Sequence, residues 1–527
     1  MGLGKPEKTE EGKSISSGVA VFLAISVAAK ALGLLRDRQQ AVHFGASTAE
    51  SIAIAQAVAV PSNMLAIMFS AALSASFIPV FVTRMEQDGK EAAYGFAALF
   101  LFLGTAFTAL LTAFGILFAE PIFRMSVGAG PIPHGTVELG ASLLRLMFPV
   151  MVLSGVALTF AGILQALGEF RITAALSVAS NGIILAYYFF FLERFGVRGL
   201  AVCFLISFAA QGLIQLPYLA RHGFGFRAVF RRKPALRGDG LRQMGLLALP
   251  ALASSWIVPA NLLVNARAAA HLYGGQYGLN AVHYAHNLYA IASGVYIIAV
   301  ANVVFPKLAR QGANADSDGF AATLLATFRA VVFALVPLTV IMAALGRQIV
   351  GFIYGGGLFG ERAVEITATA LAFYAPGIVG YGLMVILARA CFALHDGKTP
   401  LLSALAAISV NGVLSFALAP GMEVAGPALA NAAGSSVGAA LLVAALARKS
   451  VMPFSGALLL DALKMLAAGA AAYAAVALAG MRVQGPALGL FLPAAAGGLA
   501  YFACALAMGL DEAKWLKHRL MWRIGKR

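Results

Sequence analysis

Long apolar segments follow one another through almost the whole chain, and they constrain its fold more than any other feature. A helix needs about 20 apolar residues to cross the hydrocarbon core of a bilayer. Each segment is continuous instead of alternating over about ten residues, which indicates helices and argues against the strands of a membrane barrel. The fourteen segments lie at roughly 17–42, 49–83, 91–119, 137–167, 172–192, 198–220, 243–272, 280–309, 320–345, 364–394, 400–419, 424–447, 456–480 and 485–509.

The composition excludes an ordinary soluble protein. Of the 527 residues, 61% are hydrophobic and 11% are charged, whereas soluble proteins are about 45–50% apolar and about 25% charged. The sequence therefore predicts an all-α polytopic membrane protein with about 14 transmembrane helices. The polar residues 1–16 precede the first segment without a convincing cleavage site, so we expect a cytoplasmic tail and not a removed signal peptide.

The distribution of lysine and arginine predicts the orientation. With a cytoplasmic amino terminus, the cytoplasmic segments carry 24 of these residues and the outside loops carry six. This asymmetry follows the positive-inside rule and places both termini in the cytoplasm. It also explains the formal net charge of +16 as a topology signal that faces anionic membrane lipids, so nucleic acid is not an expected partner.

The chain contains an internal repeat, which appears when the sequence is aligned with itself so that Pro79 meets Pro306. The same shift, called the repeat offset below, aligns Glu120–Gly130 with Arg347–Gly357, Pro149 with Pro376, and Ala166–Arg171 with Ala393–Lys398. The repeat unit is about six helices, so both copies run in the same direction. Two parallel six-helix repeats are typical of transporters, with the substrate path between them.

These features predict six regions. They are the amino-terminal tail 1–16, an N-lobe 17–220, a basic cytoplasmic linker 221–242, a C-lobe 243–447, a two-helix appendage 448–510 and a basic amphipathic tail 511–527. The last of these alternates apolar and basic residues, as an interfacial helix does.

Charged residues inside the predicted spans are candidate functional residues, because each costs about 2.5–3.5 kcal/mol at mid-membrane on insertion scales. The first span carries Lys30, Arg36, Asp37 and Arg38 within nine residues. We expect Lys30, Arg36 and Asp37 to face an internal cavity. Snorkelling at the outer interface is the alternative for Arg36 and Arg38, and for Arg38 the two positions are equally open.

Spans 7 and 8 add a second polar group. Arg267 and His271 lie four residues apart on one helical face, and span 8 carries His283, His286 and Asn287. The histidines have no acidic partner at ligand spacing, so a polar cavity lining is a better interpretation than a metal site. Packing within the helix bundle is the remaining alternative.

Other kinds of site lack support in the sequence. The three cysteines are far apart, so neither a disulfide framework nor a zinc site is indicated. We find no Walker phosphate-binding loop and no enzyme signature, so we expect a non-enzymatic protein without a cofactor. Several intramembrane cations and few acids suit an anionic substrate, and a membrane-borne diphosphate is the obvious one.

The chain resembles the MviN/MurJ family of lipid II flippases, within the multidrug/oligosaccharidyl-lipid/polysaccharide exporter superfamily. The resemblance covers nearly the whole chain. It lies in Leu32–Asp37, Phe44–Ala46, Phe77–Val80, Tyr284–Ala285, Ser293–Gly294, Leu387–Ala390 and Asp396–Pro400. It implies fourteen helices and alternating access, in which a cationic cavity carries a diphosphate–sugar head across while the polyprenyl tail stays in lipid.

The resemblance also assigns residues, and this chain departs from several of them. Arg36 and Asp37 fall on the first-helix Arg-Asp of the family, and Lys30 falls where a second cation is usual. The second-helix arginine falls at Leu65, and the span-8 arginine falls at Asn287 with His286 in place of the neighbouring acid. Arg267, on the neighbouring helix, is a candidate to compensate. The candidate cavity residues are Lys30, Arg36, Asp37, Arg267, His286 and Asn287.

The leading hypothesis is a flippase for a polyprenyl-diphosphate-linked glycan in the bacterial inner membrane, with the peptidoglycan precursor lipid II as the first candidate. A flippase for another lipid-linked saccharide and a non-transporting scaffold for envelope synthesis are the alternatives. A multidrug exporter would need an acidic cavity for cationic drugs. We expect a monomer whose partners include anionic lipids and cell-wall synthesis proteins. Coupling to the membrane potential or to a monovalent ion is left open.

Overall fold

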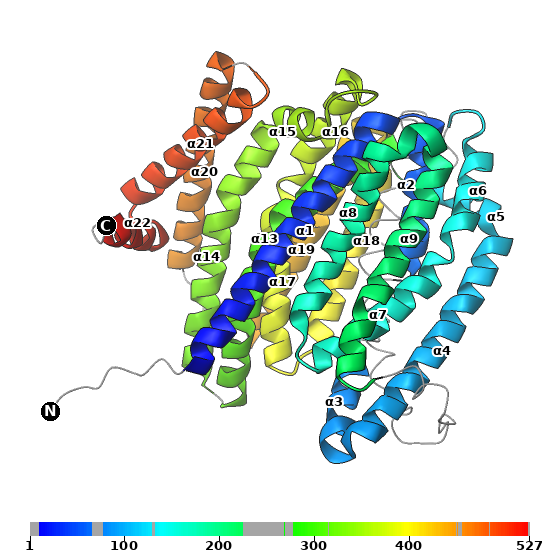
Figure 1. Ribbon diagram of the computed structural model, residues 1–527. Helices are drawn as coiled ribbons and strands as arrows, with labels where there is room; N and C mark the ends of the chain where they lie inside the picture. Colours follow the sequence, from blue (N-terminus) through cyan, green and yellow to red (C-terminus); the bar gives the residue numbers. More distant parts are fainter. Residues whose placement is uncertain are drawn as a thin grey trace. The chain divides into compact units, whose positions relative to one another are not determined.

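A computed structural model describes residues 10–65, 77–128, 132–224, 268, 278–314, 316–449, 451, 456–483 and 485–524. These residues are almost entirely helical (Figure 1). Within them, the only strand-like pairing is an isolated bridge between Gly356 and Phe359. The predicted all-α class is confirmed.

The described helices fall into two series. The first comprises α1 (Glu10–Phe44), α2 (Ala49–Leu65), α3 (Ile78–Gln87), α4 (Gly89–Leu117), α5 (Ala119–Val127), α6 (Thr136–Met147), α7 (Val150–Ala166), α8 (Phe170–Phe190) and α9 (Leu192–Arg221). The second comprises α13 (Gly278–Ala313), α14 (Ser317–Ala344), α15 (Gly346–Tyr354), α16 (Glu361–Tyr374), α17 (Gly377–Ala393), α18 (Lys398–Met422), α19 (Ala425–Arg448), α20 (Gly456–Arg482), α21 (Leu488–Ala507) and α22 (Asp511–Ile524).

Each predicted span is mostly helical wherever the chain is described. Nine helical segments of the described part are long and apolar enough to cross a membrane, and the bent pair α16–α17 makes a tenth. The predicted span 243–272 lies outside the described residues except for residue 268, and the linker 221–242 lies outside them from residue 225 onward. The expected fourteen spans are compatible with this arrangement.

Proline explains where two of the spans break. Pro149 separates α6 from α7, and Pro376 separates α16 from α17, with a bend of 47° in the second pair. Proline cannot donate the backbone hydrogen bond that would continue the preceding helix, and its ring clashes with the turn before it. Because the two prolines are separated by the repeat offset, the break itself is repeated.

The helix boundaries confirm the internal repeat. Both ends of α5 and α15, and both ends of α7 and α17, are separated by the repeat offset. The same holds for the last residues of α4 and α14, of α6 and α16, and of α9 and α19. The short helices α5 and α15 lie in loops between predicted spans, where the sequence had not predicted a helix.

The chain divides into two compact units. Unit 1 contains Met1–Phe44, Thr48–Ser126 and Pro133–Pro259, and unit 2 contains Gly45–Ser47, Val127–Ile132 and Ala260–Arg527. In unit 1, α1 packs on α8, α2 on α6, and α7 on α9. In unit 2, α19 packs on α17 and α18, and α20 packs on α14 and α21.

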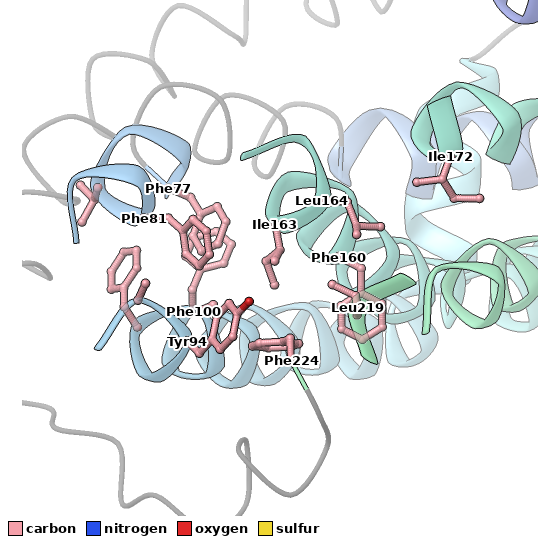
Figure 2. Close-up of a cluster of buried hydrophobic side chains, with 14 of the residues drawn as sticks. Phe77, Phe81, Tyr94, Phe100, Phe160, Ile163, Leu164, Ile172, Leu219 and Phe224 are labelled. Atoms are coloured by element: carbon pink, nitrogen blue, oxygen red, sulfur yellow. The ribbon is translucent and has the colours of Figure 1, made fainter. Parts of the chain in front are cut away.

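An aromatic cluster forms part of the core of unit 1, where α3, α4, α7 and the end of α9 meet (Figure 2). The Phe77 ring lies at its centre, with its centroid 4.5 Å from that of Phe100 and 5.6 Å from that of Phe81. The Tyr94 hydroxyl donates to the backbone carbonyl of His222 at 2.6 Å. Aromatic side chains bury much apolar area, and the tyrosine finds a partner for its polar end.

Candidate substrate-binding residues

Arg36 and Asp37 form an ion pair inside unit 1, although they are sequence neighbours. The Arg36 Nε and Nη2 atoms donate to Asp37 Oδ1 at 3.1 and 2.8 Å. The Arg36 side chain keeps 30% exposure, whereas that of Asp37 keeps 13%. The guanidinium is therefore held on one side by a carboxylate and is still reachable from outside the unit.

Asn181 of α8 holds the same guanidinium from a second side. Arg36 Nη1 donates to Asn181 Oδ1 at 3.1 Å, and Asn181 Nδ2 donates to the Ala29 carbonyl at 3.2 Å. The amide can make both bonds only in this orientation, which fixes the assignment of its oxygen and nitrogen. Because α1 packs along α8, a residue far away in the sequence becomes a neighbour of Arg36 (Figure 1).

Lys30 lies on α1 with an exposed side chain. It is six residues before Arg36, so the two side chains leave the helix about 120° apart. Lys30 and Asp37 are seven residues apart and therefore share a face. The helix thus presents Lys30 on the side of Asp37 and not on the side of Arg36.

The predicted polar group on α13 separates into two parts. Asn287 Nδ2 lies 3.3 Å from His283 Nε2, and both side chains are half-buried. The His286 ring instead packs inside unit 2, with centroids 5.7 Å from those of Tyr289 and Tyr374. Its Nδ1 atom is buried without a hydrogen-bond partner. Consecutive helical residues point about 100° apart, which explains the separation.

Two residues that the sequence singled out fall outside the described part of the chain. Arg267 lies outside the described residues, as does His271. Within the described part of the chain, no three side chains of His, Cys, Asp or Glu gather in a way that could hold a metal ion. Arg36 and Asp37 belong to unit 1 and the α13 residues to unit 2, so each group is described by itself.

Sequence reasoning missed Asn181, although a signal for it existed. Ser180 and Asn181 are buried polar residues within an otherwise apolar span. Polar side chains in transmembrane helices commonly bond to a neighbouring helix. A search for uncharged polar residues, in addition to charged ones, would have marked this position.

Other intramembrane cations serve packing. Arg329 of α14 pairs with Asp461 of α20 and with Asp511 and Glu512 of α22, the shortest contact being Nε to Glu512 Oε1 at 2.7 Å. The Arg389 guanidinium of α17 lies 5.6 Å from the centroid of the Phe305 ring. A cation over a ring face is attracted by the ring quadrupole.

Comparison with known proteins gives a consistent result. The profile of a family described as lipid II flippase MurJ matches residues 40–494, a range that begins just after Arg36 and Asp37. A probable lipid II flippase MurJ of Vibrio cholerae is 28% identical over 449 residues, 83% of each chain. The lipid II flippase MurJ of Burkholderia cenocepacia is 26% identical over 423 residues, 80% of this chain and 81% of its own.

Solved structures show the same fold. A lipid II flippase MurJ in an inward closed conformation has a TM-score of 0.77 at 21% identity, covering 92% of this chain and 98% of that one. An inward-facing multidrug transporter of the MATE family has a TM-score of 0.69 at 15% identity, covering 82% of this chain and 98% of that one. The fold is thus shared with transporters of different cargo.

Proposed function

Because the chain belongs to the lipid II flippase MurJ family, we propose that it moves lipid II from the inner to the outer leaflet of the bacterial cytoplasmic membrane by alternating access. Both termini lie in the cytoplasm in this proposal, as the distribution of lysine and arginine predicts. The protein is a multi-pass membrane transporter and not an enzyme.

The observation that carries the proposal is the arrangement of Arg36, Asp37 and Asn181. A guanidinium binds phosphate oxygens through parallel N–H donors, and it remains charged at any physiological pH. Asp37 and Asn181 fix its orientation, while its exposed fraction allows a diphosphate to approach. Asp37 also offsets part of the cost of holding a cation in the membrane before the substrate arrives.

We propose that the membrane potential favours the outward step. The diphosphate head is anionic, and the cell interior is negative. Moving each elementary charge through the potential is worth about 2.3 kcal/mol per 100 mV. Outward movement of a negative head is therefore downhill, and a bound monovalent cation is not required for this contribution.

Complementation tests the function directly. The intact chain is expressed in cells depleted of their own lipid II flippase, beside Arg36→Ala, Asn181→Ala and the control Arg362→Ala. Arg362 is exposed and pairs with its near neighbour Glu365. We expect rescue by the intact chain and by the control. Arg36→Ala should slow transport by about 30-fold or more, because a desolvated charge contact is worth about 2–5 kcal/mol.

The alternatives give different outcomes at equal membrane expression. Absence of rescue by the intact chain would point to another lipid-linked saccharide as the substrate. Such an absence of rescue would equally fit the non-transporting scaffold, whereas full rescue by Arg36→Ala would remove the proposed role of the guanidinium. Asn181→Ala is expected to be intermediate, because it frees the orientation of Arg36 but retains its charge.

A further inference from the structure

An open apolar groove lies in unit 2, between α14, α17 and α19. Its volume is about 600 Å³, and it is lined by Phe328 of α14, by Pro376 and Gly380 at the start of α17, and by one face of α19 between Ser436 and Ala447. A space of this size is typical of a site for a small molecule or a single lipid chain. The transport mechanism proposed above makes no use of it.

Small side chains on one face of α19 create the groove. Ser436, Ala440 and Ala444 follow each other at intervals of four residues, and all three are exposed. This spacing places them along one helical face. At one end, Gly380 brings α17 so close that an added Cβ would lie 2.8 Å from the Ser436 nitrogen, so the two helices touch there. Beyond this contact, the alanines leave the space unfilled.

The internal repeat supplies a natural comparison. At the repeat offset, Ala440 and Val443 of α19 correspond to Leu213 and Leu216 of α9. The same helix in the first half of the chain therefore carries leucine at two positions where the second half leaves the groove open. The smaller side chains at these two groove positions therefore belong to the sequence of the second half and are not imposed by the repeat.

The dimensions of the groove match one leaflet. Its lining on α19 runs from Ser436 to Ala447, which is about 16 Å at a rise of 1.5 Å per residue. The hydrocarbon core of a bilayer is about 30 Å thick, so the groove spans about half of it. A groove that stops at mid-membrane fits the acyl chain of a lipid that stays in one leaflet. It does not fit the tail of a lipid whose head crosses to the other side.

The charge at the end of the groove selects the head group. Arg448 is exposed and follows Ala444 by four residues, so it continues the same face at the last residue of α19. The next residue, Lys449, is already paired with Asp396. A guanidinium at a membrane surface attracts the phosphate of an anionic lipid.

We propose that this groove binds one acyl chain of an anionic phospholipid, with the lipid phosphate on Arg448. The orientation proposed above places the lipid in the cytoplasmic leaflet, and the site itself does not depend on transport. The bound lipid fills the space between three helices of unit 2 and is retained through purification.

Native mass spectrometry of the intact chain, released from phosphatidylcholine nanodiscs that contain some phosphatidylglycerol, tests the proposal. We expect one retained phosphatidylglycerol. The double variant Ala440→Leu/Val443→Leu copies the residues of the first repeat. It should reduce the occupancy of the bound phosphatidylglycerol about tenfold, because the acyl chain is no longer buried in the groove. Arg448→Gln should retain a lipid but lose the preference for phosphatidylglycerol. Leu441→Phe, an exposed neighbour that does not line the groove, should behave like the unmodified chain.

Three results would overturn the proposal. One is equal lipid retention by the double variant, provided that its thermal unfolding matches that of the unmodified chain. Another is an unchanged head-group preference in Arg448→Gln. The third is displacement of phosphatidylglycerol by an added polyprenyl phosphate, which would assign the groove to the tail of a transported lipid. Each result concerns binding alone, so none of them depends on whether the chain flips lipid II.

Discussion

Among single residues, two turns with positive φ occur in both halves of the chain, but the two halves place different residues in them. Gly168 and Gly196 have positive φ angles of 86° and 56°. Their counterparts at the repeat offset are His395 and Glu423, whose φ angles are 58° and 52°. These are the only described non-glycine residues with positive φ. Left-handed backbone costs such residues roughly 1–2 kcal/mol, so the second half carries strain that the first half avoids.

Replacing glycine by alanine should therefore change the free energy of unfolding in opposite directions at two positions. Gly168→Ala should lower the free energy of unfolding by about 1 kcal/mol, since alanine is strained at positive φ. Gly212→Ala should raise it by roughly 0.5–1 kcal/mol, because Gly212 is inside a helix. Neither added Cβ meets an atom within 4 Å, so space does not decide the result. Thermal unfolding in detergent measures both.

A matching result is expected at His395. His395→Gly should raise the unfolding temperature, because it relieves the left-handed strain at the end of α17. If Gly168→Ala and Gly212→Ala shifted stability in the same direction, backbone conformation would not be the cause.

The candidate site shows how far single residues can be predicted. The cost of intramembrane charge marks Arg36 and Asp37 in the sequence, and both lie together in the structure. Their partner Asn181 is 145 residues from Arg36. Nothing local links the two positions, because the contact exists only after α1 and α8 have packed.

At the scale of elements, one arginine joins three helices. Arg329 of α14 faces Asp461 of α20 and both Asp511 and Glu512 of α22. The side chains of Arg329, Asp461 and Glu512 are about four-fifths buried, whereas Asp511 is exposed. From the sequence alone, Arg329 is a cation within the predicted span 320–345. Its carboxylates come from segments that only the fold brings beside α14.

Loss of this arginine should release the terminal helix. Arg329→Gln should lower the free energy of unfolding by about 2 kcal/mol or more, since it removes the guanidinium that the largely buried carboxylates of Asp461 and Glu512 share. Limited proteolysis should then cut earlier within α22. Asp511→Asn is the matched control and should have little effect, because its exposed contact is weak. Unchanged protection of α22 in Arg329→Gln would contradict the anchoring role.

A second element-scale feature is a repeated polar contact between a helix–helix turn and the residue after α9 in the first half or α19 in the second. Glu169 lies 3.3 Å from His222, and their counterparts at the repeat offset are Asp396 and Lys449, which also pair. Asp396 in addition accepts from the backbone and side chain of Thr399 and so caps α18. Lys449 and these Thr399 bonds hold the pKa of the Asp396 carboxyl well below its usual range.

The lowered pKa of Asp396 determines how the stability of the fold changes with pH. A lowered folded pKa means that Asp396 stabilises the fold at neutral pH, and that this contribution falls as pH drops below the ordinary aspartate value of about 3.9. Asp396→Ala should cost about 1 kcal/mol at pH 7, the usual value of a lost cap. Unfolding measured from pH 8 to pH 5 should show a constant difference from the unmodified chain. A difference that vanished within this interval would refute the assignment, whereas Glu365→Ala, an exposed control, should show almost none.

At the scale of the whole molecule, the repeat links the sequence to the architecture. The self-alignment predicted duplicated six-helix units, and the helix ends of α5, α7 and their counterparts agree with it to the residue. The two halves have nevertheless diverged in what they do. The second half carries the apolar groove, the strained turns and the helices α20 to α22, while the first half carries the Arg36 site.

The class of fold is already evident in the chain's hydropathy, because a helix that crosses a bilayer must be long and apolar and must hydrogen-bond its own backbone. The sequence also determines the repeat, since both copies keep their prolines and turns in register. Which polar groups meet depends instead on how the helices pack. Asn181 reaches Arg36, the acids of α20 and α22 reach Arg329, and His286 packs against Tyr374 while Asn287 lies beside His283. Hydropathy is a local property of the chain, whereas these contacts depend on which helices pack together and on which face each residue lies.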